Sequence, residues 1–316
     1  FTKKDSLCPN IKMGSHCNKP YACNYKNRCK SLEAKKNITS YEILPWCPEK
    51  LKKYCEENKI VDLQKVPVNY LLSNRKGFVE NYHKKIQEAH KSNKPFFNEN
   101  LKDIFKDFSF PFYFMDFEHI GQGVPIIKGT QPYSRVPFQW SVHKWESIDK
   151  EIDKEGKSFL KFKDQDIERK FIEDLLEAVG ENGTIFAHSA KTVEISILDE
   201  LKKKDNCKDL SDKIDKLINR TVDTYILVGE NFYHPLMNGN YGIKSIIKAI
   251  PNDISYEEEG NIEEGDAAQL AWFIYTDPKT SKEEKEKQKT LLKNYCSKDT
   301  LAVYYLVKYL IEKTDE

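Results

Sequence analysis

Two acids interrupt an otherwise apolar stretch of the chain, FPFYFMDFEHIG, at residues 110–121. If this stretch is a strand, its side chains alternate between two faces, so Asp116 and Glu118 share a face with Phe114. The two carboxylates would then be about 6.5–7 Å apart along the strand. Carboxylates at that distance repel each other, and burial adds a desolvation cost, whereas a bound divalent cation removes both problems. The alternative interpretation is a strand that ends in water with both acids exposed.

A third acid interrupts the apolar stripe of a helix predicted over residues 281–313. The stripe includes Leu292 and Val303, and the helical period places Asp299 on the same face, where an apolar residue would be expected. Tyr295 lies one turn before Asp299, so the two side chains share one surface. The alternative interpretation is a buried Asp299 that is satisfied by a hydroxyl or a backbone donor.

A fourth acid, Glu194, lies in the sequence TIFAHSAKTVEISIL (residues 184–198), which is typical of a strand, a loop and a helix. Glu194 falls in the first turn of that helix, where the helix dipole favours an acid in any case. A capping role is therefore its alternative interpretation. Taken together, however, acids from separate elements that converge on one place are typical of a two-metal phosphoryl-transfer site.

The segments that must position these acids alternate between strands and helices. Strands are predicted over residues 111–118, 135–145, 157–163 and 184–188, and helices over residues 73–92, 166–180, 192–204, 211–220 and 281–313. Residues 221–229 begin extended and turn helical after Asp223. This order predicts an α/β domain with a mixed sheet flanked by helices.

The length of 316 residues allows two domains. We expect a Cys-rich metal-binding segment over residues 1–60, a helical linker over 61–108 and the α/β domain over 109–316. The 51 Lys and Arg residues and 50 Asp and Glu residues give a net charge of +1, which argues neither for nor against nucleic-acid binding. No stretch approaches the roughly 18 apolar residues that span a bilayer.

Four of the eight cysteines lie close together near the start of the chain. They are Cys8, Cys17, Cys23 and Cys29. Lys- and Asn-rich usage without a secretory signal favours the cytoplasm, where such a cluster is more often a metal site than a set of disulfides. The cluster has no C-x₂₋₄-C knuckle of the kind common at zinc sites, and its wide gaps favour a [4Fe–4S] cluster over zinc. His16 is a reserve ligand, and unligated thiols are the alternative.

The sequence Asp116-Phe117-Glu118 and the sequence YCSKD at residues 295–299 resemble two motifs of the DnaQ-like 3′–5′ exonucleases. These motifs are the D-x-E on the first strand and the Y-x-x-x-D on the last helix of the tyrosine subclass of the DEDD group. The resemblance covers about residues 109–312 and implies a ribonuclease-H-like mixed sheet. The family's second motif, N-x-x-x-D, is altered, because HSAKTVE offers Glu194 in place of the Asp and no Asn at the expected step.

Three further stretches, VPFQWSVH, FYHPLMNGNYGIKSI and NYCSKDTLAVY, resemble a poorly characterised bacterial family. In that family a DnaQ-like domain follows a region similar to the iron–sulfur recombination and CRISPR-associated nucleases. The stretch GSHCNKPYACNYKNRC is similar to the cysteine signature just upstream of the DnaQ-like domain. The similarity favours an iron–sulfur cluster at the cysteines and implies an upstream nuclease-like domain that this chain lacks.

The resemblance to the exonucleases implies a mechanism with two Mg²⁺ or Mn²⁺ ions. Asp116 would bridge the ions, Glu118 and Asp299 would complete one site, and Glu194 would support the other. Tyr295 would orient the attacking water, since a phenol with a pKa near 10 is a poor base at neutral pH. The implied partner is the single-stranded 3′ end of a nucleic acid, with DNA favoured over RNA and no membrane.

Other interpretations remain open at the level of sequence. The altered second motif would also suit a catalytically silent nucleic-acid-binding or scaffold module, and a ribonuclease-H-like endonuclease would share the strand acids. His119 and His188 lie beside motif residues and could contact phosphate, but structural roles are the simpler interpretation. Asp223 could be a further site acid, although we expect it to cap a helix.

Overall fold

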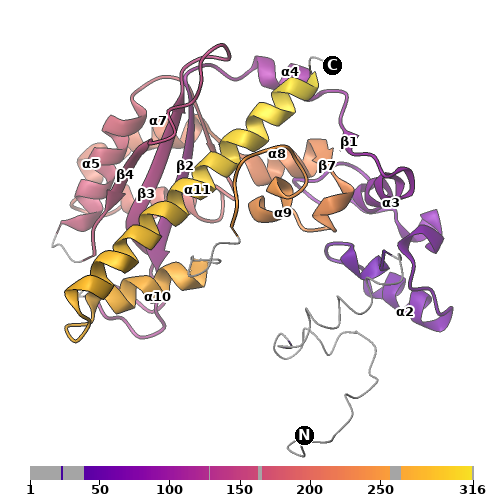
Figure 1. Ribbon diagram of the computed structural model, residues 1–316, viewed down its shortest axis with the longest axis horizontal. Helices are drawn as coiled ribbons and strands as arrows, with labels where there is room; N and C mark the ends of the chain where they lie inside the picture. The colour runs from indigo at the N-terminus through magenta and orange to yellow at the C-terminus, as the bar shows by residue number, and fades with distance from the viewer. Residues whose placement is uncertain (1–22, 24–38, 128, 163–165, 257–264, 315–316) are drawn as a thin grey trace, which may run out of the picture. The chain divides into compact units, whose positions relative to one another are not determined.

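The computed structural model describes residue 23 and residues 39–127, 129–162, 166–256 and 265–314 (Figure 1). The chain forms two compact units, Phe1–Leu72 and Ser73–Glu316. The boundaries predicted at residues 60 and 108 stay predictions, and each unit is described by itself. No helix within the described ranges has the length and apolar character needed to cross a membrane.

The described part of the first unit contains short helices, two of which begin with side-chain caps. They are η2 (Tyr41–Ile43), α2 (Glu49–Glu57), η3 (Leu63–Lys65) and η4 (Val68–Tyr70). The hydroxyl of Ser40 accepts a hydrogen bond from the backbone N–H of Glu42, and the carboxylate of Asp62 caps η3 in the same way. Leu51 and Cys55, one turn apart on α2, are both buried. This helix was not predicted, because its sequence has only these two core positions.

A five-stranded mixed sheet forms the centre of the second unit, in the order β4-β3-β2-β5-β6. Its strands are β2 (Phe112–Ile120), β3 (Val136–Trp145), β4 (Lys157–Leu160), β5 (Thr184–Ala187) and β6 (Thr221–Asp223). β3 is antiparallel to β2 and β4, whereas β2, β5 and β6 run parallel to one another. Together with the helices beside it, the sheet confirms the predicted α/β class.

Helices pack on the two faces of β2, whose side chains alternate between them. On one face Met115 and Phe117 pack in a cluster with residues of α5 (Ile167–Val179), α6 (Glu194–Leu201) and α7 (Ser211–Asn219). On the other face Phe112 and Phe114 pack against α11 (Lys282–Thr314). Figure 1 shows α11, in yellow, lying along the sheet in front of β3 and β2, with α5 and α7 behind. The even-numbered residues of β2 therefore face the last helix.

Smaller elements complete the second unit. They are α3 (Tyr82–Ser92), β1 (Phe96–Phe97), α4 (Leu101–Lys106), η5 (Lys208–Leu210), α8 (Thr224–Asn231), β7 (Phe232–Tyr233), η6 (Pro235–Met237), α9 (Ile243–Ile247) and α10 (Gly265–Thr276). β1 and β7 form an antiparallel pair.

The prediction of a helix over residues 73–92 was wrong in its first half. The helix begins only at Tyr82, because Asn81 has a left-handed backbone with a φ of 57°.

Candidate metal site

The contact between α11 and the sheet consists of two apolar clusters with a polar region between them. One cluster includes Phe114 and Val303, and the other includes Ile120 and Leu292. The residues that lie between these positions along β2 and along α11 include Asp116, Glu118, Tyr295 and Asp299. We call these four residues, together with Glu194, the acid site. The acids therefore interrupt an interface that is apolar on both sides of them.

The acids of this site lie in the interior rather than at an exposed strand end. The exposed fraction is 7% for Glu118, 9% for Asp299 and 1% for Glu194, while Asp116 is half-buried. Tyr295 is 8% exposed. Since charged groups are almost never this buried without compensation, their position needs a chemical explanation.

Electrostatics show that the four carboxylates lie within reach of one another. Burial raises the pKa of Asp116 well above its usual range, and the charge of Asp299 raises it further. Burial also raises the pKa of Glu118, with added contributions from Asp116, Asp299 and Glu194. The pKa of Glu194 is raised by burial and then by Asp116. Three separate elements, β2, α6 and α11, thus bring four like charges together.

Glu194 reaches the site from the first residue of α6. Backbone N–H groups of Glu194 itself and of Phe117 favour its charged form and partly offset the rise in its pKa. One carboxylate oxygen, Oε2, is buried and has no hydrogen-bond partner among the described residues. An unpaired buried oxygen costs about 1–3 kcal/mol, so this atom is an available ligand position.

Asp299 is held by two tyrosines. The hydroxyl of Tyr256 donates a hydrogen bond of 2.7 Å to Oδ1 of Asp299, and the hydroxyl of Tyr295 also bonds to this carboxylate. These bonds lower the pKa of Asp299, although burial has the larger effect and raises it. The pKa values of Tyr256 and Tyr295 are themselves raised by burial and by neighbouring carboxylates. Both phenols therefore remain protonated at neutral pH.

Lys244, on α9, adds a positive charge to the site. Its ammonium lies 3.3 Å from the hydroxyl oxygen of Tyr295 and lowers the pKa of Asp116, Glu118 and Asp299. Neither Lys244 nor Tyr256 was predicted from the sequence. Lys244 follows a turn-forming stretch and Tyr256 lies outside the helices and strands, so no period pointed to either residue.

Polar residues of β3 line the sheet beside the acids. Ser141 pairs with Asp116 and Gln139 pairs with Glu118, so both lie next to the acid site on the sheet. The register then slips by one residue, because His119 pairs with Pro137, and such bulges re-aim side chains next to functional sites. The amide of Gln139 donates to the carbonyl of Leu292 over 2.8 Å, which ties β3 to α11. Sequence reasoning missed these residues.

A thiol contacts the first acid. Cys296 is fully buried, and its Sγ donates to Oδ2 of Asp116 over 3.3 Å. Burial raises the pKa of this thiol, with a further rise from Asp116, so it stays protonated and remains a donor. The bond holds one oxygen of the Asp116 carboxylate in place.

Among the residues beside the motifs, His188 and Asp223 have structural partners. Burial lowers the pKa of His188 to about 4, and its Nε2 donates to the carbonyl of Tyr241 while Nδ1 accepts from the hydroxyl of Thr224. Burial and the nearby Arg135 lower the pKa of His119, also to about 4. Asp223 caps α8 by accepting from the N–H of Tyr225, as predicted.

The donor set of the acid site fits hard cations such as Mg²⁺ or Mn²⁺. All four acids offer oxygen ligands, and Oε2 of Glu194 is unpaired. Within the described ranges, however, no three His, Cys, Asp or Glu side chains are already arranged around a common ion position. Of the predicted cysteine ligands, Cys23 is a partly exposed free thiol. Cys8, Cys17, Cys29 and the reserve ligand His16 lie outside the described residues.

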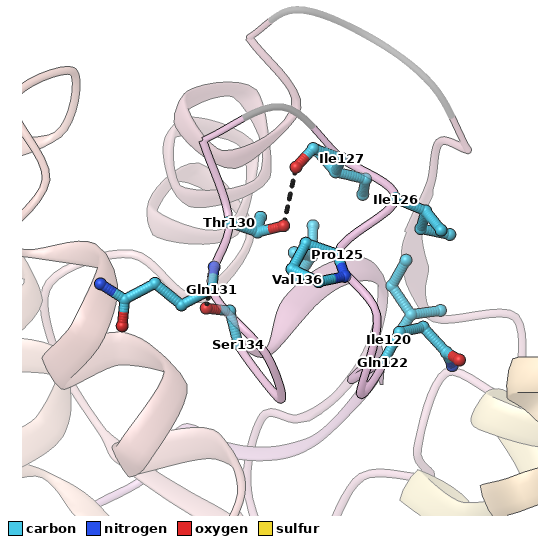
Figure 2. Close-up of a pocket in the computed structure, with 9 residues that line it drawn as sticks. All are labelled: Ile120, Gln122, Pro125, Ile126, Ile127, Thr130, Gln131, Ser134 and Val136. Carbon is cyan, nitrogen blue, oxygen red and sulfur yellow. Dashed lines mark hydrogen bonds between the residues drawn. The ribbon is translucent and has the colours of Figure 1, made fainter.

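A pocket opens in the loop between β2 and β3, next to the acid site along the strand. Figure 2 shows its lining residues, which are Ile120, Gln122, Pro125, Ile126, Ile127, Thr130, Gln131, Ser134 and Val136. The hydroxyl of Thr130 donates to the carbonyl of Ile127 over 2.7 Å and braces the loop. The lining contains none of the acids, so the pocket is a neighbour of the acid site and not part of it.

Comparison with known families adds one finding. A family model described as a domain of unknown function, DUF2779, matches residues 113–242. The matched region begins in β2 and contains Asp116, Glu118 and Glu194, but it ends before Lys244 and α11. No curated protein and no solved structure matches the chain.

Proposed function

We propose that the second unit is a metal-dependent 3′–5′ exonuclease that hydrolyses phosphodiester bonds at single-stranded nucleic-acid ends, with DNA favoured over RNA. The observation that carries this proposal is the gathering of four carboxylates from three separate elements, three of them buried and Asp116 half-buried, whose charges raise the pKa of neighbouring acids. Such an arrangement is unfavourable by itself and becomes favourable when divalent cations neutralise it.

The topology supports a site at this place. The parallel strands β2, β5 and β6 have their carboxyl ends at the same end of the sheet. The chain adds β3 and β4 on one side of β2 and then β5 and β6 on the other, so the strand order reverses its direction at β2. Ligands of open α/β sheets bind outside the carboxyl ends of the strands at such a switch point. The strand order, with the second strand antiparallel, is also that expected for a ribonuclease-H-like sheet.

In this proposal Asp116, Glu118, Glu194 and Asp299 hold two Mg²⁺ or Mn²⁺ ions. Bound ions of this kind lower the pKa of a water and stabilise the departing oxygen of a phosphodiester. Glu194 contributes its unpaired Oε2. Cys296 fixes the orientation of Asp116, and Tyr256 fixes that of Asp299.

In this proposal Tyr295 positions the water that attacks the phosphodiester. The hydroxyl of Tyr295 lies among Asp299, Glu118 and Asp116, and each of these carboxylates raises its pKa. Because this phenol keeps its proton at neutral pH, it orients water by hydrogen bonding and does not act as a general base.

The test is degradation of 3′-labelled single-stranded DNA and RNA in the presence of Mn²⁺. Asp116→Asn and Asp299→Asn preserve side-chain size but remove charge, and we expect each to slow nucleotide release by about 100-fold or more. Asp253→Asn is the control, since Asp253 is exposed and pairs with Lys154 over 2.8 Å. Equal rates for wild type and both site variants would refute the proposal.

Circular single-stranded DNA distinguishes the two nuclease classes. An exonuclease needs an end and leaves the circle intact, whereas an endonuclease linearises it. Cleavage of the circle that depends on Asp116 would replace the exonuclease by the ribonuclease-H-like endonuclease.

A further inference from the structure

Lys244 contacts two tyrosine rings at the acid site. Its ammonium lies 4.7 Å from the ring centre of Tyr295 and 5.0 Å from that of Tyr256. Both distances are within the range of a cation–π contact. The same ammonium donates to the hydroxyl of Tyr295 over 3.3 Å. Two aromatic rings and one hydroxyl thus fix its position.

The two tyrosines that hold Lys244 also hold Asp299. The hydroxyl of Tyr256 donates to Oδ1 of Asp299 over 2.7 Å, and Tyr295 bonds to the same carboxylate. Lys244 and Asp299 are therefore linked through shared partners. A lysine held in this way adds positive charge to a site that has four negative groups.

Cations and Lys244 would compete for the same negative charge. Before cations bind, the ammonium partly balances the carboxylates. Once divalent ions supply that charge, the ammonium is available for another anion at the same place. In the proposed reaction this anion is the phosphodiester, and a lysine ammonium is a strong point-charge partner for phosphate oxygens.

We propose that Lys244 balances the negative charge of the acid site before cations bind and then binds a non-bridging phosphate oxygen of the substrate. This inference rests on the proposed function and extends it to the recognition of the scissile phosphate. It assigns α9, a short helix that supplies none of the predicted site residues, to substrate binding.

The test compares Lys244→Gln and Lys244→Arg with wild type in two measurements. The first is the Mn²⁺ affinity without nucleic acid, by isothermal titration calorimetry. Loss of one nearby positive charge should tighten Mn²⁺ binding by about tenfold in Lys244→Gln, whereas Lys244→Arg should keep the wild-type affinity. The second is steady-state degradation, in which Lys244→Gln should raise KM by about tenfold, because a phosphate contact is lost.

Tighter metal binding combined with weaker substrate binding is a pattern that damage to the fold does not produce. The matched control is Lys248→Gln, since Lys248 is exposed one turn later at the end of α9 and should change neither quantity. If both quantities worsen together with the melting temperature in Lys244→Gln and Lys244→Arg, Lys244 is only structural and the inference is wrong.

Failure of this inference and failure of the proposed function give different results. Wild-type protein that binds Mn²⁺ and degrades DNA, with Lys244→Gln unchanged in both measurements, would overturn the role of Lys244 alone. Wild-type protein that binds no Mn²⁺ would overturn both.

Discussion

At the scale of single residues, the raised pKa values of the acids at the acid site have a consequence for stability. Because the folded pKa of Asp116, Glu118 and Glu194 lies above the unfolded value, the folded state keeps protons that the unfolded chain releases. Without divalent cations, the contribution of these groups is therefore most favourable at low pH and is lost as the pH rises through the folded pKa. His119 and His188 act in the opposite direction, and only below the unfolded pKa of about 6.5.

We therefore predict that the free energy of unfolding, measured in urea without divalent cations, decreases as the pH rises from about 5 towards the folded pKa of these acids. Each acid that is still protonated in the folded state contributes up to about 1.4 kcal/mol per pH unit. Glu194→Gln should flatten this decrease, whereas Glu181→Gln, at an exposed position, should leave it unchanged. A free energy that stays constant or rises over this range would contradict the account of the acid site.

Residues with a regular period could be found from the sequence, and those without one could not. Asp116 and Glu118 followed from the alternation of a strand, and Asp299 followed from the period of a helix. The interior positions of Glu118 and Asp299, and the half-buried position of Asp116, agree with both patterns. Lys244 and Tyr256 reach the site from a short helix and from a segment outside regular structure, so only three-dimensional packing shows that they are neighbours.

At the scale of elements, the rotation of α11 decides whether Tyr295 and Asp299 face the sheet. Apolar contacts of Val303 and Val307 fix the half of the helix that follows the acids. Next to Asp299, the hydroxyl of Thr300 lies 2.7 Å from Nδ1 of His143 on β3, and both residues are fully buried. This polar contact fixes the helix beside the acids.

Thr300→Val keeps the shape of the side chain and removes its hydroxyl. The variant leaves Nδ1 of His143 without this partner, and we expect a loss of about 1–3 kcal/mol in the free energy of unfolding. Chemical denaturation measures this loss. Thr290→Val is the control on the same helix, because the hydroxyl of Thr290 is exposed and bonds only within the helix, to the carbonyl of Glu286. Equal stability of the two variants would show that the contact with His143 does not hold α11.

The bounds of a helix with a clear hydrophobic period were predicted closely, whereas a helix with a nearly uniform apolar sequence was not predicted. The last helix was predicted over residues 281–313 and extends over Lys282–Thr314, since its charged start and apolar stripe are clear. α10 was not predicted, because its sequence, GDAAQLAWFIYT, is apolar nearly throughout and gives no helical period.

At the scale of the whole molecule, the acid site and the cysteine cluster belong to different units. The acids and their described partners all lie within Ser73–Glu316, and the three large apolar clusters of the sheet consist of residues from this unit. Cys8, Cys17, Cys23 and Cys29 belong to Phe1–Leu72. The two proposed metal chemistries should therefore be separable.

We predict that a fragment of residues 73–316 folds and keeps Mn²⁺-dependent degradation, but carries no iron or zinc after purification under nitrogen. The full chain should carry iron and acid-labile sulfide, or zinc if the cysteines hold that metal instead. Circular dichroism, the degradation assay and metal analysis check the three parts. Iron or zinc retained by the fragment would show that the cysteine cluster of the first unit does not hold that metal.

The most direct test of the central claim is anomalous X-ray scattering from crystals grown with Mn²⁺. The account predicts manganese peaks beside Asp116, between β2 and α11, with carboxylate oxygens of Glu118, Asp299 and Glu194 as ligands. Manganese that is absent from this place at saturating concentration, with the four carboxylates arranged as they are without metal, would contradict the account.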